Sequence, residues 1–321
     1  MSFTPRPEVY DTYWYFAAER QNTFIKRLSG AKAPYTQDPI LAQYKFCNTY
    51  RALDRETQFL IREVIYSSSY SPQDTLFRIM LFRLFNKHQT WVALEKLLGE
   101  ISLTTFSPGA YSALLEKIRE EGPIYGNAFI LCANKAFGFD QKHNNHLALL
   151  EYTFLRSEMG RKLEEAKSLR ELFMVLRELP LIGNFMAYQI AIDMNYSEVF
   201  NFSENDFTIA GPGAERGIAK CFSSYEKSDR EAIIMYMVEN QEKEFQRLGL
   251  NFARIGNRPL QAIDCQGLFC ETDKYSRVRF PELASNRKQI KASFTPSPAP
   301  IEYFFPPKWQ IEAICTGQQL L

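Results

Sequence analysis

Apolar residues recur at three- and four-residue steps along most of the chain, which is the period of an amphipathic helix. One such stripe ends before Pro180 and consists of Leu169, Leu172, Phe173, Leu176 and Leu179. Another helix is predicted over residues 228–248, with Gly249 at its C-terminal stop. Strand-like alternation is scarce. The pattern therefore predicts a mainly α protein.

Two further segments carry basic residues within apolar patterns. A stripe between residues 46 and 64 consists of Phe46, Tyr50, Leu53, Leu60, Ile61 and Val64. If this segment is helical, Asn48, Arg51 and Arg55 share the opposite face. Residues 76–85 are apolar nearly all round, which predicts a buried helix, with Arg78 and Arg83 as exceptions. A buried arginine needs a partner, so we expect each to pair with a carboxylate or to face a cleft, and favour the structural ion pair.

The end of the chain changes character. Prolines stand among aromatic residues there, at Pro296, Pro298, Pro300, Pro306 and Pro307. We expect residues 1–290 to form a helical domain, either as one body or as two packed lobes with a cleft between them. Residues 291–321 would form an extended arm. Its aromatic residues favour docking, through Tyr303, Phe304, Phe305 and Trp309.

Composition limits the function. The 38 Lys and Arg residues face 37 Asp and Glu, a net charge of +1, so a nucleic-acid partner would need a local basic face. The six cysteines show no paired spacing of the kind that holds zinc, and we expect neither a metal nor a cofactor. No signal peptide or apolar run of membrane-spanning length is evident, which favours a cytoplasmic protein, or a nuclear one in a eukaryote.

The segment from Leu179 to Gly183 predicts a tight turn between two helices, the second of which starts at Asn184. Backbone N–H groups at such a helix N-terminus can hold a DNA phosphate. Gly183, Asn184 and Gln189 are therefore candidate DNA-binding residues. The turn alone is equally compatible with an ordinary helical hairpin.

Asp206 follows Gly183 by 23 positions. In this order the sequence resembles the helix-hairpin-helix DNA-glycosylase superfamily, in which a catalytic Asp follows the hairpin at the start of the next helix. The resemblance implies that Asp206 is catalytic, since a carboxylate stabilises the oxocarbenium character that develops when an N-glycosidic bond breaks. A helix N-cap is the alternative role. Phe185 occupies the position of the lyase lysine, so the resemblance implies a monofunctional enzyme.

A glycine-rich segment follows Asp206. Gly211 and Gly213 could expose N–H groups to an anion, and Arg216 could contact a phosphate. The segment lacks the lysine of a P-loop, and no GxxxxGK[ST] run occurs anywhere in the sequence. We therefore expect no kinase chemistry.

Several blocks resemble, in one order, the helical domain named for 5-hydroxymethyl-deoxyuridine DNA kinases. They are Glu19–Gln21, Asp38–Leu41, Tyr44–Arg55, Leu76–Arg78, Arg83–Asn86, Leu179–Gly183, Ala210–Ala214 and Asp264–Glu271. The resemblance spans about Tyr10 to Pro281 and implies a glycosylase-like fold associated with hypermodified phage DNA. The polar residues of the early blocks are candidates for binding phosphate or a flipped base, or else form a solvated face: Arg20, Lys45, Asn48, Arg51, Asp54 and Arg55.

Our leading hypothesis is a DNA glycosylase that flips a hypermodified, phage-type pyrimidine out of double-stranded DNA and excises it, with a role in antiphage defence. A transferase acting on activated 5-hydroxymethyluracil and a non-catalytic reader of modified DNA are the alternatives. We expect neither association with a membrane nor an obligatory protein partner.

Overall fold

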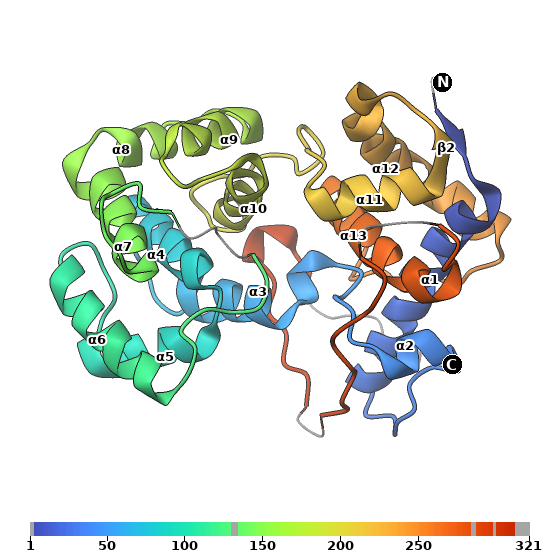
Figure 1. Ribbon diagram of the computed structural model, residues 1–321, viewed down its shortest axis with the longest axis horizontal. Helices are drawn as coiled ribbons and strands as arrows, with labels where there is room; N and C mark the ends of the chain where they lie inside the picture. Colours follow the sequence, from blue (N-terminus) through green and yellow to red (C-terminus); the bar gives the residue numbers. More distant parts are fainter. Residues whose placement is uncertain (1–2, 130–133, 284–286, 298–299, 312–321) are drawn as a thin grey trace. The chain divides into compact units, whose positions relative to one another are not determined.

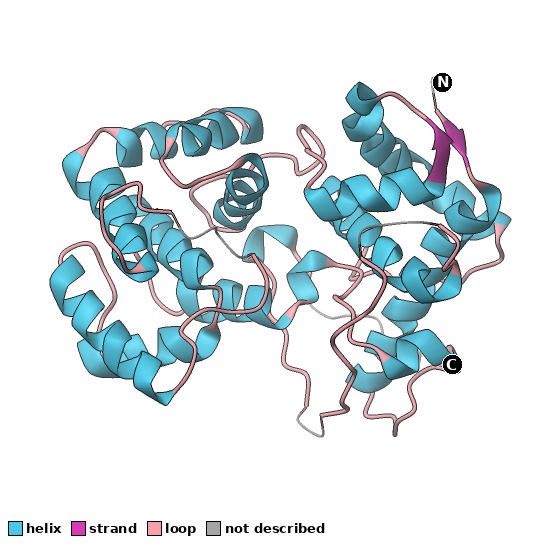
Figure 2. Ribbon diagram, in the orientation of Figure 1, coloured by secondary structure: helices cyan, strands magenta, loops and turns pink. Residues whose placement is uncertain are grey.

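The computed structural model describes residues 3–129, 134–283, 287–297 and 300–311. Helices dominate these residues (Figure 2). Two short strands, β1 (Thr4–Pro5) and β2 (Phe222–Ser224), pair antiparallel. The prediction of a mainly α fold is therefore confirmed. Among the described helices, none combines the length and apolar character that crossing a membrane requires.

The described residues form two compact units. The terminal unit comprises those within Met1–Asp54, Phe207–Tyr303 and Trp309–Leu321. The central unit comprises those within Arg55–Asp206 and Phe304–Lys308. The domain boundary expected near residue 290 stays a prediction.

The terminal unit is built on two long helices, α1 (Pro7–Leu28) and α13 (Ala262–Arg279) (Figure 1). Its other elements are α2 (Pro39–Gln43), the 3₁₀ turn η1 (Arg51–Leu53), α11 (Pro212–Cys221), the 3₁₀ turn η4 (Lys227–Asp229) and α12 (Arg230–Arg247). Pro7 opens α1 and basic residues close it, as the free N–H groups and the helix dipole favour. The helix buries Tyr13, Trp14 and Phe16 completely.

Helices α11 and α13 pack unusually closely, and two glycines permit it. A Cβ atom added at Gly217 would lie 2.0 Å from the carbonyl oxygen of Phe269. One added at Gly213 would lie 2.6 Å from Cys270 Sγ. Backbone contact between two helices requires residues without side chains, so this glycine-rich segment is needed for helix packing.

The central unit begins with α3 (Arg55–Phe59), which continues into the π-helical turn η2 (Leu60–Ile65). Its other elements are α4 (Pro72–Phe85), α5 (His88–Leu98), α6 (Pro108–Glu121), α7 (Lys142–Glu151), the π-helical turn η3 (Tyr152–Arg156), α8 (Met159–Glu164), α9 (Leu169–Glu178) and α10 (Asn184–Asn195). The hairpin is present as predicted, because α9 ends before Leu179 and Gly183 is the N-cap of α10. Leu181 completes the turn with φ +69°.

Helix α4 is buried, as its apolar pattern predicts, and its two arginines find different partners. Arg83 forms the expected ion pair, with Asp193 of α10, at 2.6 Å between Nε and Oδ2. Arg78 instead donates to the carbonyl oxygens of Val64 (2.9 Å) and Ile101 (2.7 Å). Its guanidinium also stacks 3.8 Å from the centre of the Tyr70 ring. Two backbone carbonyl oxygens and the face of an aromatic ring thus replace the carboxylate as partners of Arg78.

The helix expected across residues 46–64 does not form as one element. The backbone is extended at Tyr50 (ψ 122°) and at Asp54 (ψ 141°), on either side of η1. Asn48, Arg51 and Arg55 therefore do not share a helical face. Local polar contacts outweigh the apolar period here, because the N–H groups of Asn48 and Arg51 bond to carboxylates instead of helical carbonyls.

His143 and His146 lie buried in α7. The helix expected over residues 228–248 is α12, and Gly249 follows it with φ +62°, as a glycine stop predicts.

The described residues of the C-terminal segment form no helix before the 3₁₀ turn η5 (Pro307–Trp309). Gln58 binds the backbone of Phe304 through both amide atoms, accepting from its N–H at 2.7 Å and donating to its oxygen at 3.2 Å. Lys308 donates to the carbonyl oxygens of Asn195 and Ser197 at 2.6 Å each, near the C-terminus of α10. Docking of residues 304–308 in the central unit is thus confirmed. Residues 312–321 of the expected arm lie outside the described residues.

Candidate functional site

Hydrogen bonds in the terminal unit join polar residues from blocks far apart in the sequence. Arg20 of α1 donates through Nε to the Cys47 carbonyl oxygen (3.0 Å) and through Nη2 to Asn48 Oδ1 (2.7 Å). Asn48 in turn donates its backbone N–H to Asp54 Oδ1 at 2.8 Å and its side-chain amide to the Leu53 oxygen at 2.7 Å. The turn before η1 is thereby fixed to α1.

Helix α13 supplies the other side of this arrangement. Glu271 Oε2 accepts the N–H of Cys47 at 2.9 Å and pairs with Lys274 Nζ at 3.2 Å. Lys274 also contacts the Lys45 carbonyl oxygen and lies 4.5 Å from the centre of the Phe46 ring. We call this group the Arg20 cluster, and define it as Arg20, Cys47, Asn48, Asp54, Glu271 and Lys274.

The carboxylates of Asp54 and Glu271 shift the pKa values of groups in the Arg20 cluster. Burial raises the pKa of Asp54 to about 6, and the charge of Glu271 adds to the rise, while the Asn48 N–H and Arg20 oppose it. The charges of Asp54 and Glu271 hold the pKa of the Cys47 thiol well above its usual value, so this thiol stays protonated. A carboxyl group that titrates near neutral pH can accept a proton from a substrate hydroxyl.

The raised pKa of Asp54 predicts a pH-dependent gain in stability for Asp54→Asn. The carboxyl titrates at about 6 when folded and at about 3.8 when unfolded, so ionised Asp54 weakens the fold as pH rises through 6. We expect Asp54→Asn to be more stable than the wild type by about 1–3 kcal/mol above about pH 7, and equal to it below about pH 4. Urea unfolding across this range measures the difference. A gain that is independent of pH would contradict the assignment.

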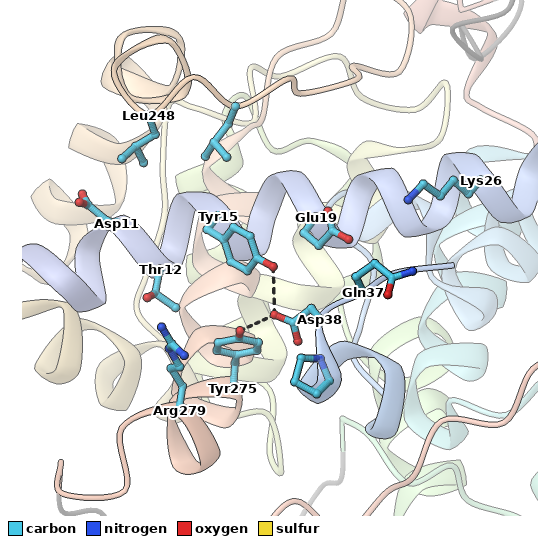
Figure 3. Close-up of a pocket in the computed structure, with 12 residues that line it drawn as sticks. Asp11, Thr12, Tyr15, Glu19, Lys26, Gln37, Asp38, Leu248, Tyr275 and Arg279 are labelled. Carbon is cyan, nitrogen blue, oxygen red and sulfur yellow. Dashed lines mark hydrogen bonds between the residues drawn. The ribbon is translucent and has the colours of Figure 1, made fainter. Parts of the chain in front are cut away.

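A separate cavity of about 790 Å³ lies in the terminal unit between α1, α2 and the end of α13. Figure 3 shows Tyr15 and Tyr275 directing their hydroxyls at Asp38, with O–O distances of 3.1 and 2.6 Å. Asp38 Oδ1 also accepts the N–H groups of Ile40 and Leu41 and so caps α2. With four hydrogen bonds already made, Asp38 orders the wall of the cavity.

Asp206, the predicted catalytic residue, lies exposed in a bend after α10, in the central unit. Its N–H donates to the Ser203 oxygen at 3.3 Å. The alternative role as an N-cap is wrong, because Gly211 caps α11. Of the hairpin candidates, Gly183 and Asn184 are exposed, whereas Gln189 is buried within α10.

Most of the remaining predicted site residues make contacts within the terminal unit. Gly213 lies against Cys270, as described above, and Arg216 Nε pairs with the buried Asp273 at 3.3 Å. Arg51 is buried, and its N–H binds Asp264 Oδ1 at 2.8 Å. Arg55 is exposed at the start of α3.

The predicted site residues are divided between the units. The terminal unit holds Arg20, Lys45, Asn48, Arg51, Gly211, Gly213 and Arg216, and the central unit holds Arg55, Gly183, Asn184, Gln189 and Asp206. Of the first set, the structure brings together Arg20, Asn48 and the backbone of Lys45. Their binding roles stay predictions.

Sequence reasoning included Asp54 among the candidate polar residues but did not select Asp38 or Glu271 as site residues. Their partners are up to 237 positions away in the chain, as for Tyr275 and Asp38. Only Asp38 carried a local signal, an Asp followed by Pro39 at the start of a helix.

Among the residues that the structure describes, no group of three or more His, Cys, Asp and Glu side chains is arranged to hold an ion. Burial raises the pKa of the Cys270 thiol to about 12, so it stays protonated at neutral pH. Cys132 and Cys315 lie outside the described residues.

The fold and the cluster define a mainly helical protein whose polar site is assembled from α1, α13 and the turn before η1. The model of one family, described as "5-hmdU DNA kinase, helical domain", matches residues 7–285. The chain belongs to this family, as its resemblance predicted. A protein of Bacillus phage SP10 named "5-hmdU DNA kinase" is 26% identical over an alignment of 288 residues, and the match covers 83% of this chain and 45% of the phage protein. The chain thus spans about half the length of this curated relative, and no solved structure matches.

These comparisons correct the predicted activity. Base excision is wrong, because the family and the phage relative are both named for a DNA kinase. The same names contradict the two alternatives and the expectation that kinase chemistry does not apply. Asp206 also lacks the position at a helix start on which the excision hypothesis depended. Membership of the helix-hairpin-helix superfamily stays a prediction.

Proposed function

We propose that this chain acts in the phosphorylation of 5-hydroxymethyl-deoxyuridine in DNA, and that its terminal unit holds the modified nucleotide. The family match over residues 7–285 is the observation that carries the proposal. The phage relative of that name supports it. The chain corresponds to 45% of that relative, and we propose that this part both binds the modified nucleotide and carries out the phosphoryl transfer.

The reaction requires a base for the hydroxyl proton and groups that hold the triphosphate. The hydroxymethyl oxygen attacks the γ-phosphorus of a nucleoside triphosphate, the bond from that phosphorus to the diphosphate oxygen breaks, and the hydroxyl proton passes to a base. Asp54 suits the role of base because its pKa is about 6. This sequence contains no P-loop, and we propose that other groups hold the triphosphate.

Two matched duplexes test the proposal. They differ at one central position, which holds either 5-hydroxymethyl-deoxyuridine or thymidine, the same base without the hydroxyl. A hydrogen bond from the hydroxyl to a carboxylate is worth about 1.5–3 kcal/mol, so we expect about tenfold to hundredfold tighter binding of the modified duplex. With ATP and Mg²⁺ supplied, mass spectrometry of the digested DNA should show a phosphorylated modified nucleoside. Equal affinity for the two duplexes, or an unphosphorylated modified base, would contradict the proposal.

Asp54→Asn refines this experiment. We expect at least about a hundredfold loss of phosphoryl transfer, since general bases contribute about 10²–10⁴-fold. Because the same variant is expected to be more stable at neutral pH, unfolding would not explain the loss. Asp140→Asn, at an exposed carboxylate of the central unit, is the matched control. Equal rates for the two variants would exclude Asp54 as the base.

A further inference from the structure

A buried ion cluster on α13 holds more positive than negative charge. Asp273 is fully buried, and its carboxylate contacts Arg277 Nη2 (2.6 Å), Lys220 Nζ (3.1 Å) and Arg216 Nε (3.3 Å). Burial alone would raise the pKa of Asp273, but the hydrogen bonds from Arg277 and Lys220 outweigh it and lower the pKa. Glu215, beside Arg216, pairs with Arg230 at 2.7 Å. One carboxylate therefore faces three cations.

Arg277 links this cluster to a basic segment of the chain. Its Nη1 donates to the carbonyl oxygen of Gln289 at 3.1 Å. The same segment lies antiparallel to residues 43–45, since Lys45 N–H donates to the Ala292 oxygen and Phe294 N–H to the Gln43 oxygen, both at 2.9 Å. The segment is thus held at two places along its length, at Gln289 by α13 and at Ala292 and Phe294 by the chain before η1.

Basic residues gather where this segment meets α13 and the chain before η1. We call this surface the basic strip, and define it as Lys45, Arg277, Arg287, Lys288 and Lys291. All but Arg277 are exposed. The sequence has no Asp or Glu between residues 283 and 301, although the whole chain has a net charge of only +1. Local charge of one sign on a nearly neutral protein marks a surface for an anionic partner.

We propose that the basic strip binds the phosphodiester backbone of the DNA substrate. The identity of the polymer rests on the proposed function, whereas the phosphate chemistry rests on the strip itself. Lysine side chains contact phosphate oxygens without reading the base, and their binding releases counterions. Arg277 fixes the strip in place from the buried Asp273, so the exposed lysines are positioned before DNA arrives. The triphosphate of a nucleotide offers the same oxygens and is the competing ligand.

Neutralising three exposed lysines tests the strip. In a variant with Lys45→Gln, Lys288→Gln and Lys291→Gln, we expect the affinity for DNA at about 50 mM salt to fall about tenfold or more. The slope of log affinity against log salt should fall by about two to three, because each phosphate contact contributes about 0.9. Both duplexes should lose affinity by the same factor. The matched control replaces three exposed lysines of the central unit, as Lys96→Gln, Lys117→Gln and Lys167→Gln.

The outcomes separate this inference from the proposed function. If the strip variant and the control bind DNA equally, or if the wild type binds neither duplex, the strip does not hold the backbone. If the wild type binds both duplexes equally but the strip variant binds them more weakly, the strip is supported and selection of the modified base fails. If the variant keeps its affinity for DNA but loses affinity for ATP alone, measured by calorimetry, the strip holds a nucleotide instead.

Discussion

Gly217→Ala is expected to destabilise the protein by about 3 kcal/mol or more, at the upper end of the usual cost of overpacking. The added methyl group would lie 2.0 Å from the oxygen and 2.6 Å from the carbonyl carbon of Phe269. These are backbone atoms of α13, which cannot rotate away as a side chain can, so α11 and α13 must separate. Urea unfolding measures the loss. DNA affinity should fall with it, because α13 carries Glu271, Asp273 and Lys274.

Gly267→Ala on α13 is the matched control. Its Cβ would meet nothing within 4 Å. Alanine is favoured over glycine inside a helix, so we expect this variant to be more stable by about 0.5–1 kcal/mol. The two substitutions add the same methyl group to helices that contact each other. If both variants unfolded at the same urea concentration, the close approach of α11 to α13 would be contradicted.

Arg83→Met is expected to cost about 3–5 kcal/mol in the central unit, because it leaves the Asp193 carboxylate buried without its cation. Both side chains are completely buried. Arg83 binds Asp193 through Nε at 2.6 Å and Nη2 at 2.9 Å, and its Nη1 reaches Asn86 Oδ1 at 2.6 Å. The free energy of unfolding, measured with urea, gives the loss.

A double-variant cycle shows whether charge causes that loss. Asp193→Asn keeps the shape of the side chain and removes its charge. Combined with Arg83→Met, it should give a total loss smaller than the sum of the two single losses by about 2 kcal/mol. Additive losses would mean that the two residues stabilise α4 and α10 independently. Arg78→Met offers a comparison, since that guanidinium binds carbonyl oxygens.

Residue spacing alone did not predict the structural neighbours of the candidate site residues. Asp206 was selected for its distance from Gly183, yet it lies exposed before a helix that Gly211 caps. Gly213 was selected as an anion-binding glycine, yet its lack of a side chain is what lets α11 approach α13. A spacing gives the position of a residue in the chain but not its neighbours, and its chemistry depends on those neighbours.

The same limit applies to the Arg20 cluster. The blocks that contain Arg20, Asn48 and Glu271 were recognised in the sequence as features of one family. Their meeting point was not, because Cys47 and Glu271 are 224 positions apart. The raised pKa of Asp54 follows from burial and from a second carboxylate, and neither exists before the chain has folded.

The sequence by itself determined those features that depend on near neighbours in the chain. The apolar period predicted α4, α9 and α12, the turn at Gly183 predicted the hairpin, and the order of the blocks predicted the family. The tertiary structure alone decided which charges are paired, as between Arg83 and Asp193, and where positive charge remains in excess, as around Asp273. Helix propensity and turn geometry act over a few residues, whereas burial and charge pairing join side chains that only the folded chain brings together.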